Sequence, residues 1–117
     1  MADDRFQLLP GTLELLVLRV LTRGELHGYE IARAIQERSK ELLQVEEGSL
    51  YPALHRMEKR GLIEATWGQS DSNRRAKYYS LTKKGRVEYA AQAERWQRVS
   101  GAVANVLRAS TAESASR

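Results

Sequence analysis

The sequence predicts a mainly α-helical chain with one small β-hairpin, that is, a winged helix-turn-helix followed by a long C-terminal helix. Three observations predict this fold. Apolar residues recur every three or four positions up to Gly61, which is the period of amphipathic helices. Two strand-like runs then flank a polar turn, as in a hairpin. From Thr82 onward, apolar residues follow a heptad spacing.

The first two helices are predicted by their apolar stripes. Thr12 is the expected N-cap of the first helix, which ends at Arg23-Gly24. The second helix is expected from about His27 to Arg38, and His27 is expected to be structural because no motif supplies it with a catalytic partner. The residues expected to be buried are Leu13, Leu15, Leu16, Val17, Leu18, Val20, Leu21, Ile31, Ala34 and Ile35.

The third predicted helix has two different faces. It is expected to begin with Ser49 as N-cap, to hold Pro52 in its first turn and to end before Gly61. One face is apolar and consists of Leu50, Leu54 and Met57. Another face carries Pro52, His55, Arg56 and Lys59. Such a helix can enter the major groove of DNA, although the pattern alone fits an ordinary amphipathic surface helix better.

A basic hairpin follows this helix. Its strands are predicted at 62–67 and 76–81, and residues 68–75 form a long polar tip that contains Arg74 and Arg75, with Lys77 at the base of the second strand. Adjacent arginines on a protruding ribbon can straddle a phosphate backbone or reach into a minor groove. A basic helix followed directly by a basic hairpin is more specific than either feature alone, and it is the arrangement of a winged helix.

The charge distribution favours a nucleic acid partner. The chain has a formal net charge of +4, but residues 55–86 contain nine Lys and Arg against three Asp and Glu, so this stretch is +6 and the remainder is −2. A basic block beside a neutral-to-acidic remainder is typical of a phosphate-facing surface, although a solvated charged face gives the same count.

Other function classes have little support. With two histidines and no cysteine, the chain cannot build a zinc site of the usual nitrogen and sulfur type, and it has no glycine-rich phosphate loop or dinucleotide motif. We therefore expect no catalytic residues, no metal and no cofactor. The acidic N-terminus, the lack of an apolar run long enough to span a membrane and the lack of cysteine predict a cytoplasmic protein.

The C-terminal helix is expected over residues 82–108 with Thr82 as its cap, after a DNA-binding domain at 1–81 and before a disordered tail at 109–117. Its heptad seam, interrupted by Gln92, consists of Tyr89, Trp96, Val99, Val103 and Val106. The seam can pack on its own domain or on the same helix of a second chain. We favour a homodimer, because the helix is longer than a compact three-helix core can cover.

Three segments of the chain resemble the PadR-like transcriptional regulators. They are residues 11–18 with 26–31 (GTLELLVL and LHGYEI), residues 48–63 (GSLYPAL, then RMEKRGLI) and residues 74–85 (RRAKYY, then LT and Gly85). Together they cover nearly everything from Gly11 to Gly85 in the order and at the spacing of that family. The single C-terminal helix resembles that of the family's short-form members.

The resemblance implies a dimeric repressor that places the third helix in the major groove of double-stranded DNA and the wing along the flanking backbone, with the Tyr51 hydroxyl on a phosphate. The candidate DNA-binding residues are Ser49, Tyr51, Pro52, His55, Arg56, Lys59, Arg74, Arg75 and Lys77. Drug-sensing relatives are similar in carrying a tryptophan at the place of Trp96, which is therefore the candidate site for a small aromatic effector. The alternatives are a Trp96 that only packs in the interface, and a winged-helix module that binds proteins without DNA.

Overall fold

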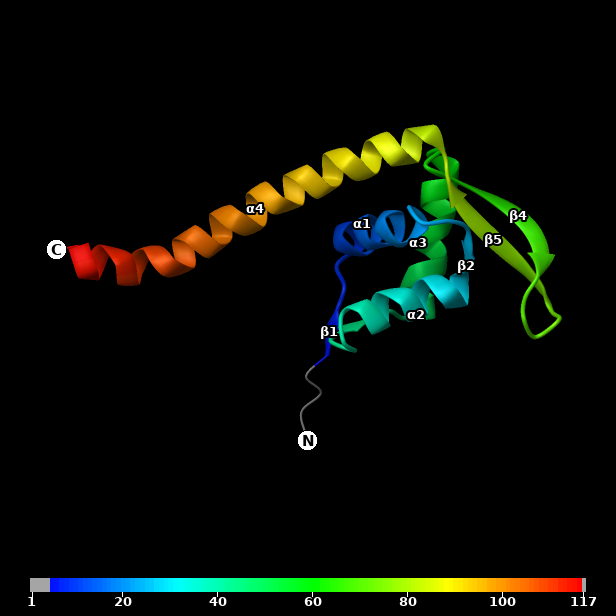
Figure 1. Ribbon diagram of the computed structural model, residues 1–117, viewed down its shortest axis with the longest axis horizontal. Helices are drawn as coiled ribbons and strands as arrows, with labels where there is room; N and C mark the ends of the chain where they lie inside the picture. The colour runs from blue at the N-terminus through cyan, green and yellow to red at the C-terminus, as the bar shows by residue number, and fades with distance from the viewer. Residues whose placement is uncertain (1–4, 117) are drawn as a thin grey trace.

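Three short helices and a three-stranded sheet share one core, and a fourth, longer helix extends away from it (Figure 1). The computed structural model describes residues 5–116, and the side chains of residues 5–108. The elements are β1 (Phe6–Gln7), α1 (Pro10–Leu21), β2 (Leu26–His27), α2 (Gly28–Arg38), β3 (Leu43–Gln44), α3 (Glu47–Lys59), β4 (Ile63–Gln69), β5 (Arg75–Leu81) and α4 (Lys83–Ser116). The predicted fold, mainly α with a small sheet and a long final helix, is confirmed.

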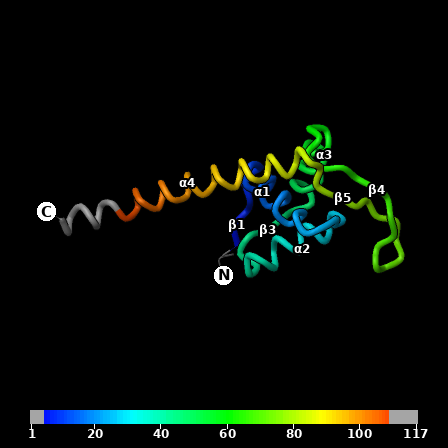
Figure 2. The backbone as a smooth tube through the Cα atoms, turned by 45° about the horizontal axis from the view of Figure 1, so that its top comes forward, coloured from blue at the N-terminus to red at the C-terminus, as the bar shows by residue number. Residues whose placement is uncertain are grey.

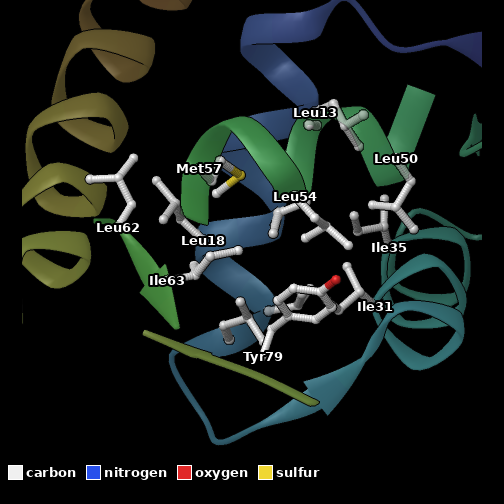
Figure 3. Close-up of a cluster of buried hydrophobic side chains, with 14 residues drawn as sticks. Leu13, Leu18, Ile31, Ile35, Leu50, Leu54, Met57, Leu62, Ile63 and Tyr79 are labelled. Carbon is white, nitrogen blue, oxygen red and sulfur yellow. The ribbon is translucent and has the colours of Figure 1, made fainter. Parts of the chain in front are cut away.

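One apolar core holds α1, α2 and α3 against the sheet. Figure 3 shows Leu18 of α1 and Ile31 of α2 near Leu54 of α3, with Ile63 and Tyr79 closing the cluster from β4 and β5. The predicted residues that are buried are Leu13, Leu15, Val17, Leu18, Val20, Leu21, Ile31, Ile35, Leu50, Leu54 and Met57, and Leu16 and Ala34 lie half-buried at its edge. Each fully buried aliphatic side chain stabilises the fold by about 1.5–3 kcal/mol, so this cluster positions the surface elements described below.

Helix α1 begins two residues before the predicted N-cap. Its first residue is Pro10 and the N-cap position is Leu9, so the prediction of Thr12 as N-cap was wrong. Proline has no N–H to satisfy and its φ is already helical, which suits the first position of a helix.

Helix α3 also begins early. Its first residue is Glu47, so Ser49 lies inside the first turn, where its N–H donates to the Glu46 carbonyl (3.0 Å), and it is not the N-cap. Pro52 is consequently the sixth helical residue and lies past the first turn, contrary to the prediction. A glutamate in the first turn favours this earlier start, because its charge opposes the positive end of the helix dipole.

His27 is the N-cap of α2. Its Nδ1 accepts a hydrogen bond from the backbone N–H of Glu30 (3.3 Å), and the Glu30 carboxylate accepts one from the backbone N–H of His27 (3.1 Å). This reciprocal pair satisfies two N–H groups that have no partner within a helix. The structural role predicted for His27 is confirmed.

The strand order of the sheet is β2-β5-β4, and β4 with β5 forms the predicted hairpin, which we call the wing. Pairing continues out to Gln69 and Arg75, so the loop is shorter than the predicted tip, and Arg75 belongs to a strand. Asn73 in the loop has a left-handed φ of 61°, which asparagine tolerates better than most residues. Strand β2 and the parallel β1–β3 pair were not predicted, because two-residue strands have no period to detect.

The turns on either side of the wing are formed by glycine and threonine. Gly61 has a φ of 75° and ends α3 as predicted, with the Leu62 N–H bonded to the Met57 carbonyl (3.0 Å). Thr82 Oγ1 accepts a hydrogen bond from the N–H of Gly85 (2.9 Å), which confirms Thr82 as the cap of α4. A Cβ on Gly85 would collide with the Leu62 carbonyl, so glycine is required where the first turn of α4 passes the residue that precedes β4.

Helix α4 packs on α1 at its start and then runs free of the other elements (Figure 2). It continues to Ser116, past the predicted end near Arg108. The side chains of residues 109–117 are outside the described part of the chain, and the disordered tail expected there stays a prediction.

Candidate nucleic-acid interface

Helix α3 turns its polar side to solvent. Its buried positions, Leu50, Ala53, Leu54 and Met57, lie on one side, so the remaining positions turn outward at 3.6 residues per turn. The outward residues include the predicted Tyr51, Pro52, His55, Arg56 and Lys59, all exposed. Among residues 5–108, no ion pair with a carboxylate is found for Arg56 or Lys59. Both cations are therefore available to a phosphate or a base edge.

The wing turns one of its faces toward α3. Residues directly opposite each other in antiparallel strands have side chains on the same face of a sheet. The pairs on this face are Ile63↔Leu81, Ala65↔Tyr79, Trp67↔Lys77 and Gln69↔Arg75. Ile63 and Tyr79 are buried in the core at the base of the wing, so Trp67, Lys77 and Arg75 continue the same face outward.

An ion pair ties the wing to α3. Lys77 Nζ lies 3.2 Å from Glu58 Oε1, and the ammonium is 5.6 Å from the ring centroid of Tyr79. Burial raises the pKa of the Tyr79 hydroxyl above its usual value, so it stays neutral at physiological pH. Lys77, a predicted DNA-binding residue, therefore has its charge balanced by the carboxylate of Glu58. The ion pair also joins the wing to α3.

Trp67 belongs to this surface although it was not predicted to. Its indole is 60% exposed, and the Arg75 guanidinium lies 4.5 Å from the ring centroid. A guanidinium stacked on an indole is held in plane while its N–H groups remain free to donate. The alternation of side chains along a strand could have indicated this position. Trp67 lies two residues after Ala65 and four after Ile63, so it is on the core-facing side of β4, but beyond the core itself.

A groove of about 540 Å³ joins α3 to the wing. Tyr51, Arg74, Arg75 and Lys77 line it, together with Gly28 at the start of α2. The Tyr51 ring, 45% exposed, rests on Gly28, where an added Cβ would lie 2.7 Å from the hydroxyl oxygen and 2.8 Å from Cε1. Gly28 is the second residue that the sequence prediction missed, because its role is to leave room for Tyr51.

The structure brings most of the predicted residues to one surface. Lys77 lines the groove with Tyr51 and also a second one with His55 and Lys59, so α3 and the wing form a continuous face. Ser49 lies apart from both grooves and lines a small pocket with residues of β1 and β3.

Part of the basic block serves the fold instead. Arg60 Nη1 is 2.6 Å from Glu14 Oε1 of α1, and Lys84 Nζ donates to the Arg60 carbonyl (2.8 Å). The charge count of the sequence therefore overstates the number of cations that face a nucleic acid.

Helix α4 carries a row of exposed apolar side chains. Trp96, Val99, Val103 and Val106 are 50%, 52%, 52% and 72% exposed. Tyr89, the fifth residue of the predicted seam, is half-buried against the core of the same chain. Trp96 and Val99 also line a cleft of about 350 Å³ between α4 and the first turn of α1. An exposed apolar row of this length is typical of a protein–protein contact.

Fold and surface together define the class as a winged helix-turn-helix, with helix and wing presenting cations on one side. The model of the transcriptional regulator PadR-like family matches residues 17–91, and the chain belongs to this family. It is therefore a DNA-binding transcriptional regulator. Between residues 5 and 116, no helix combines the length and the apolar character that crossing a bilayer requires.

Solved structures agree with this assignment. A PadR-like transcriptional regulator from Bacillus cereus is 36% identical, with a TM-score of 0.72 over 84% of this chain and 93% of that one. A transcriptional regulator from Clostridium thermocellum is 30% identical, with a TM-score of 0.74 over 81% and 92%. Among curated proteins, an uncharacterized protein from Lysinibacillus sphaericus is 30% identical over 95 residues, which are 81% of this chain and 87% of that protein.

Proposed function

We propose that the protein is a transcriptional repressor that binds a pseudo-palindromic operator in duplex DNA as a homodimer. The observation that carries the proposal is the continuous face formed by α3 and the wing, which includes Lys59 and Arg74, with Arg56 exposed on the outward side of α3. None of these three cations has an ion-pair partner among residues 5–108. An exposed polar helix side fits the major groove, and a basic ribbon beside it can follow the flanking backbone. The proposal includes no enzymatic activity and places the protein in the cytoplasm.

Within this face, α3 reads sequence and the wing supplies affinity. His55 and Arg56 are assigned to base edges, because guanidinium and imidazole groups can pair with guanine in the major groove. Phosphate contacts are assigned to Tyr51, Lys59 and the wing. The full set proposed to bind DNA is Tyr51, Pro52, His55, Arg56, Lys59, Arg74, Arg75 and Lys77, together with Ser49 in the first turn of α3, outside the two grooves.

Binding to operator and random duplexes across a salt series tests this division. His55→Ala and Arg56→Ala should change sequence preference. Arg74→Ala and Arg75→Ala should weaken binding to all sequences alike and flatten the salt slope by about one per lost phosphate contact. Arg98→Ala is the charge-matched control, because Arg98 lies on α4 away from this face. Loss of specificity from the wing variants, with the α3 variants neutral, would reverse the assignment.

The second part of the proposal is a dimer formed through α4. The apolar row of Trp96, Val99, Val103 and Val106 would be covered by the same row of a second copy. Residues 1–81 then form the DNA-binding unit and residues 82–108 the dimerisation helix. A two-fold pair of α3 helices about 34 Å apart would match half-sites one turn of DNA apart.

Charged substitutions in the row test the dimer. Val99→Lys combined with Val103→Lys should yield monomers by light scattering at micromolar concentration and should abolish operator binding. Gln97→Lys combined with Asn105→Lys adds the same charge on another side of α4 and should leave the dimer intact. A monomeric unmodified protein would contradict the proposal.

The third part of the proposal is release from DNA by a small aromatic effector at Trp96. The indole is half-exposed in the cleft beside α1, and paired indoles across a dimer axis can hold a planar ring between them. In a Trp67→Phe background, a planar cationic dye should quench Trp96 saturably, and Trp96→Ala should abolish dye binding while the dimer survives. Unchanged fluorescence across a panel of aromatic compounds would leave Trp96 as a packing residue.

The competing function is a winged-helix module that binds a protein partner without DNA. Titration of random duplex DNA at rising salt separates the two. A DNA-binding protein shows an affinity that falls steeply and linearly on a log–log plot, whereas a protein-binding module shows no measurable affinity at low salt.

A further inference from the structure

A separate groove of about 460 Å³ lies between α1, α2 and β3. Its apolar floor is formed by Leu16, Val20, Ile35 and Leu43, all of which belong to the core cluster or pack against it. Its rim carries Arg19, Arg23 and Arg38. None of the lining residues belongs to α3, to the wing or to α4, so the groove is distinct from the DNA-binding face and from the cleft at Trp96.

Among the side chains of residues 5–108, the three arginines have no acidic partner. No carboxylate lines the groove, and among the side chains described, no ion pair is found for any of the three. Arg19 and Arg38 lie in the last turns of their helices, where a cation interacts favourably with the negative end of the helix dipole. That effect does not account for Arg23, which follows the end of α1 and lines the same groove.

The remaining polar side chain of the groove, Ser39, is hydrogen-bonded to the backbone. Ser39 Oγ donates to the Gln36 carbonyl (3.0 Å) and accepts the N–H of Leu43 (3.1 Å). Recognition in this groove therefore depends on guanidinium groups above an apolar floor.

We propose that the groove binds a small amphipathic organic anion, a single carboxylate or sulfonate on an apolar body. Arginine pairs with such oxyanions through two parallel N–H groups, and the floor removes the apolar body from water. Leu16 and Val20 of the floor lie one helical turn apart, about 6 Å along the axis of α1, and Arg23 lies past the end of that helix, so the arginine rim extends beyond the apolar floor. A volume of about 460 Å³ is also in the range of small-molecule sites.

Three probes of matched chemistry test the proposal on the intact protein. Decanoate has both the anion and the chain, decanol has the chain alone, and inorganic phosphate has the charge alone. Decanoate should bind saturably by calorimetry and shift the amide resonances of residues in α1, α2 and β3. Decanol and phosphate should bind at least about tenfold more weakly, because each lacks one of the two contributions.

Substitution of the rim identifies the site. Arg19→Gln combined with Arg38→Gln should weaken decanoate binding at least about tenfold without changing the amide spectrum elsewhere. Arg98→Gln combined with Arg108→Gln removes the same charge from α4 and should leave binding unchanged, as should Trp96→Ala. Decanoate binding that survives loss of the rim arginines, equals that of decanol or disappears with Trp96→Ala would overturn the proposal. So would binding only to anionic phospholipid vesicles.

Discussion

Replacement of Gly28 by alanine isolates the contact that positions Tyr51. Gly28 is the first residue of α2 and lies directly under the Tyr51 ring, where a Cβ would be 2.7, 2.8 and 2.9 Å from three atoms of that side chain. Ordinary van der Waals contact starts at 3.4 Å, so the hydroxyl must move by at least 0.7 Å, the difference between 3.4 and 2.7 Å. Because Tyr51 is 45% exposed, it can move outward without disturbing the core.

The expected loss is in affinity and not in stability. A hydrogen bond to a charged phosphate contributes about 1.5–3 kcal/mol, so a displaced Tyr51 weakens binding to each half-site by at least about tenfold. Because a dimer binds two half-sites, the two losses multiply, and the affinity for the whole operator falls by at least about a hundredfold. The free energy of unfolding should stay level or rise slightly, because alanine is a better helix former than glycine and the φ of Gly28 is not in the left-handed region.

Fluorescence anisotropy with labelled operator measures the affinity, and urea unfolding measures the stability. A double-mutant cycle with Tyr51→Phe decides the mechanism. If Gly28 acts only by positioning Tyr51, Gly28→Ala adds no further loss in the Tyr51→Phe background. An unchanged operator affinity for Gly28→Ala, or losses that add in full, would refute the reasoning.

Three further outcomes follow from the same structure. Leu54→Ala should lower the free energy of unfolding by about 2–5 kcal/mol in urea denaturation, because Leu54 is fully buried and its removal leaves a cavity; a loss below about 1 kcal/mol would contradict its central place in the core. Trp67→Ala should weaken DNA binding as much as Arg75→Ala, and the double variant no further, because the indole holds the guanidinium; additive losses would contradict that coupling. Gly101→Ala should raise the stability of α4 by up to about 1 kcal/mol with DNA binding unchanged, because nothing lies within 4 Å of the added Cβ; a lower melting temperature would show that this position is covered in the dimer.

The helix boundaries were predicted less well than the helix faces. The buried face of α3 was correct because Leu50, Leu54 and Met57 repeat the helical period over several turns. The predicted start of α3 was wrong, because several residues near a helix end can act as a cap. Ser49 was predicted as the N-cap, whereas the helix begins two residues earlier, at Glu47. The long wing tip was likewise overestimated, because polar residues at its edges pair as readily as apolar ones once the strands are aligned.

The sequence by itself determined the four helices, the wing, the core and the stretch that carries the excess positive charge. These features follow from period and composition, which are local properties of the chain. Only the tertiary structure decided which side chains share a surface. The contacts of Gly28 with Tyr51, Glu58 with Lys77 and Trp67 with Arg75 join residues that lie well apart along the chain, and no local pattern records them. They arise because packing of the core brings α2, α3 and the wing to one side of the molecule. There Tyr51 lies over Gly28, which has no Cβ, Lys77 lies beside the carboxylate of Glu58, and Arg75 stacks on the indole of Trp67.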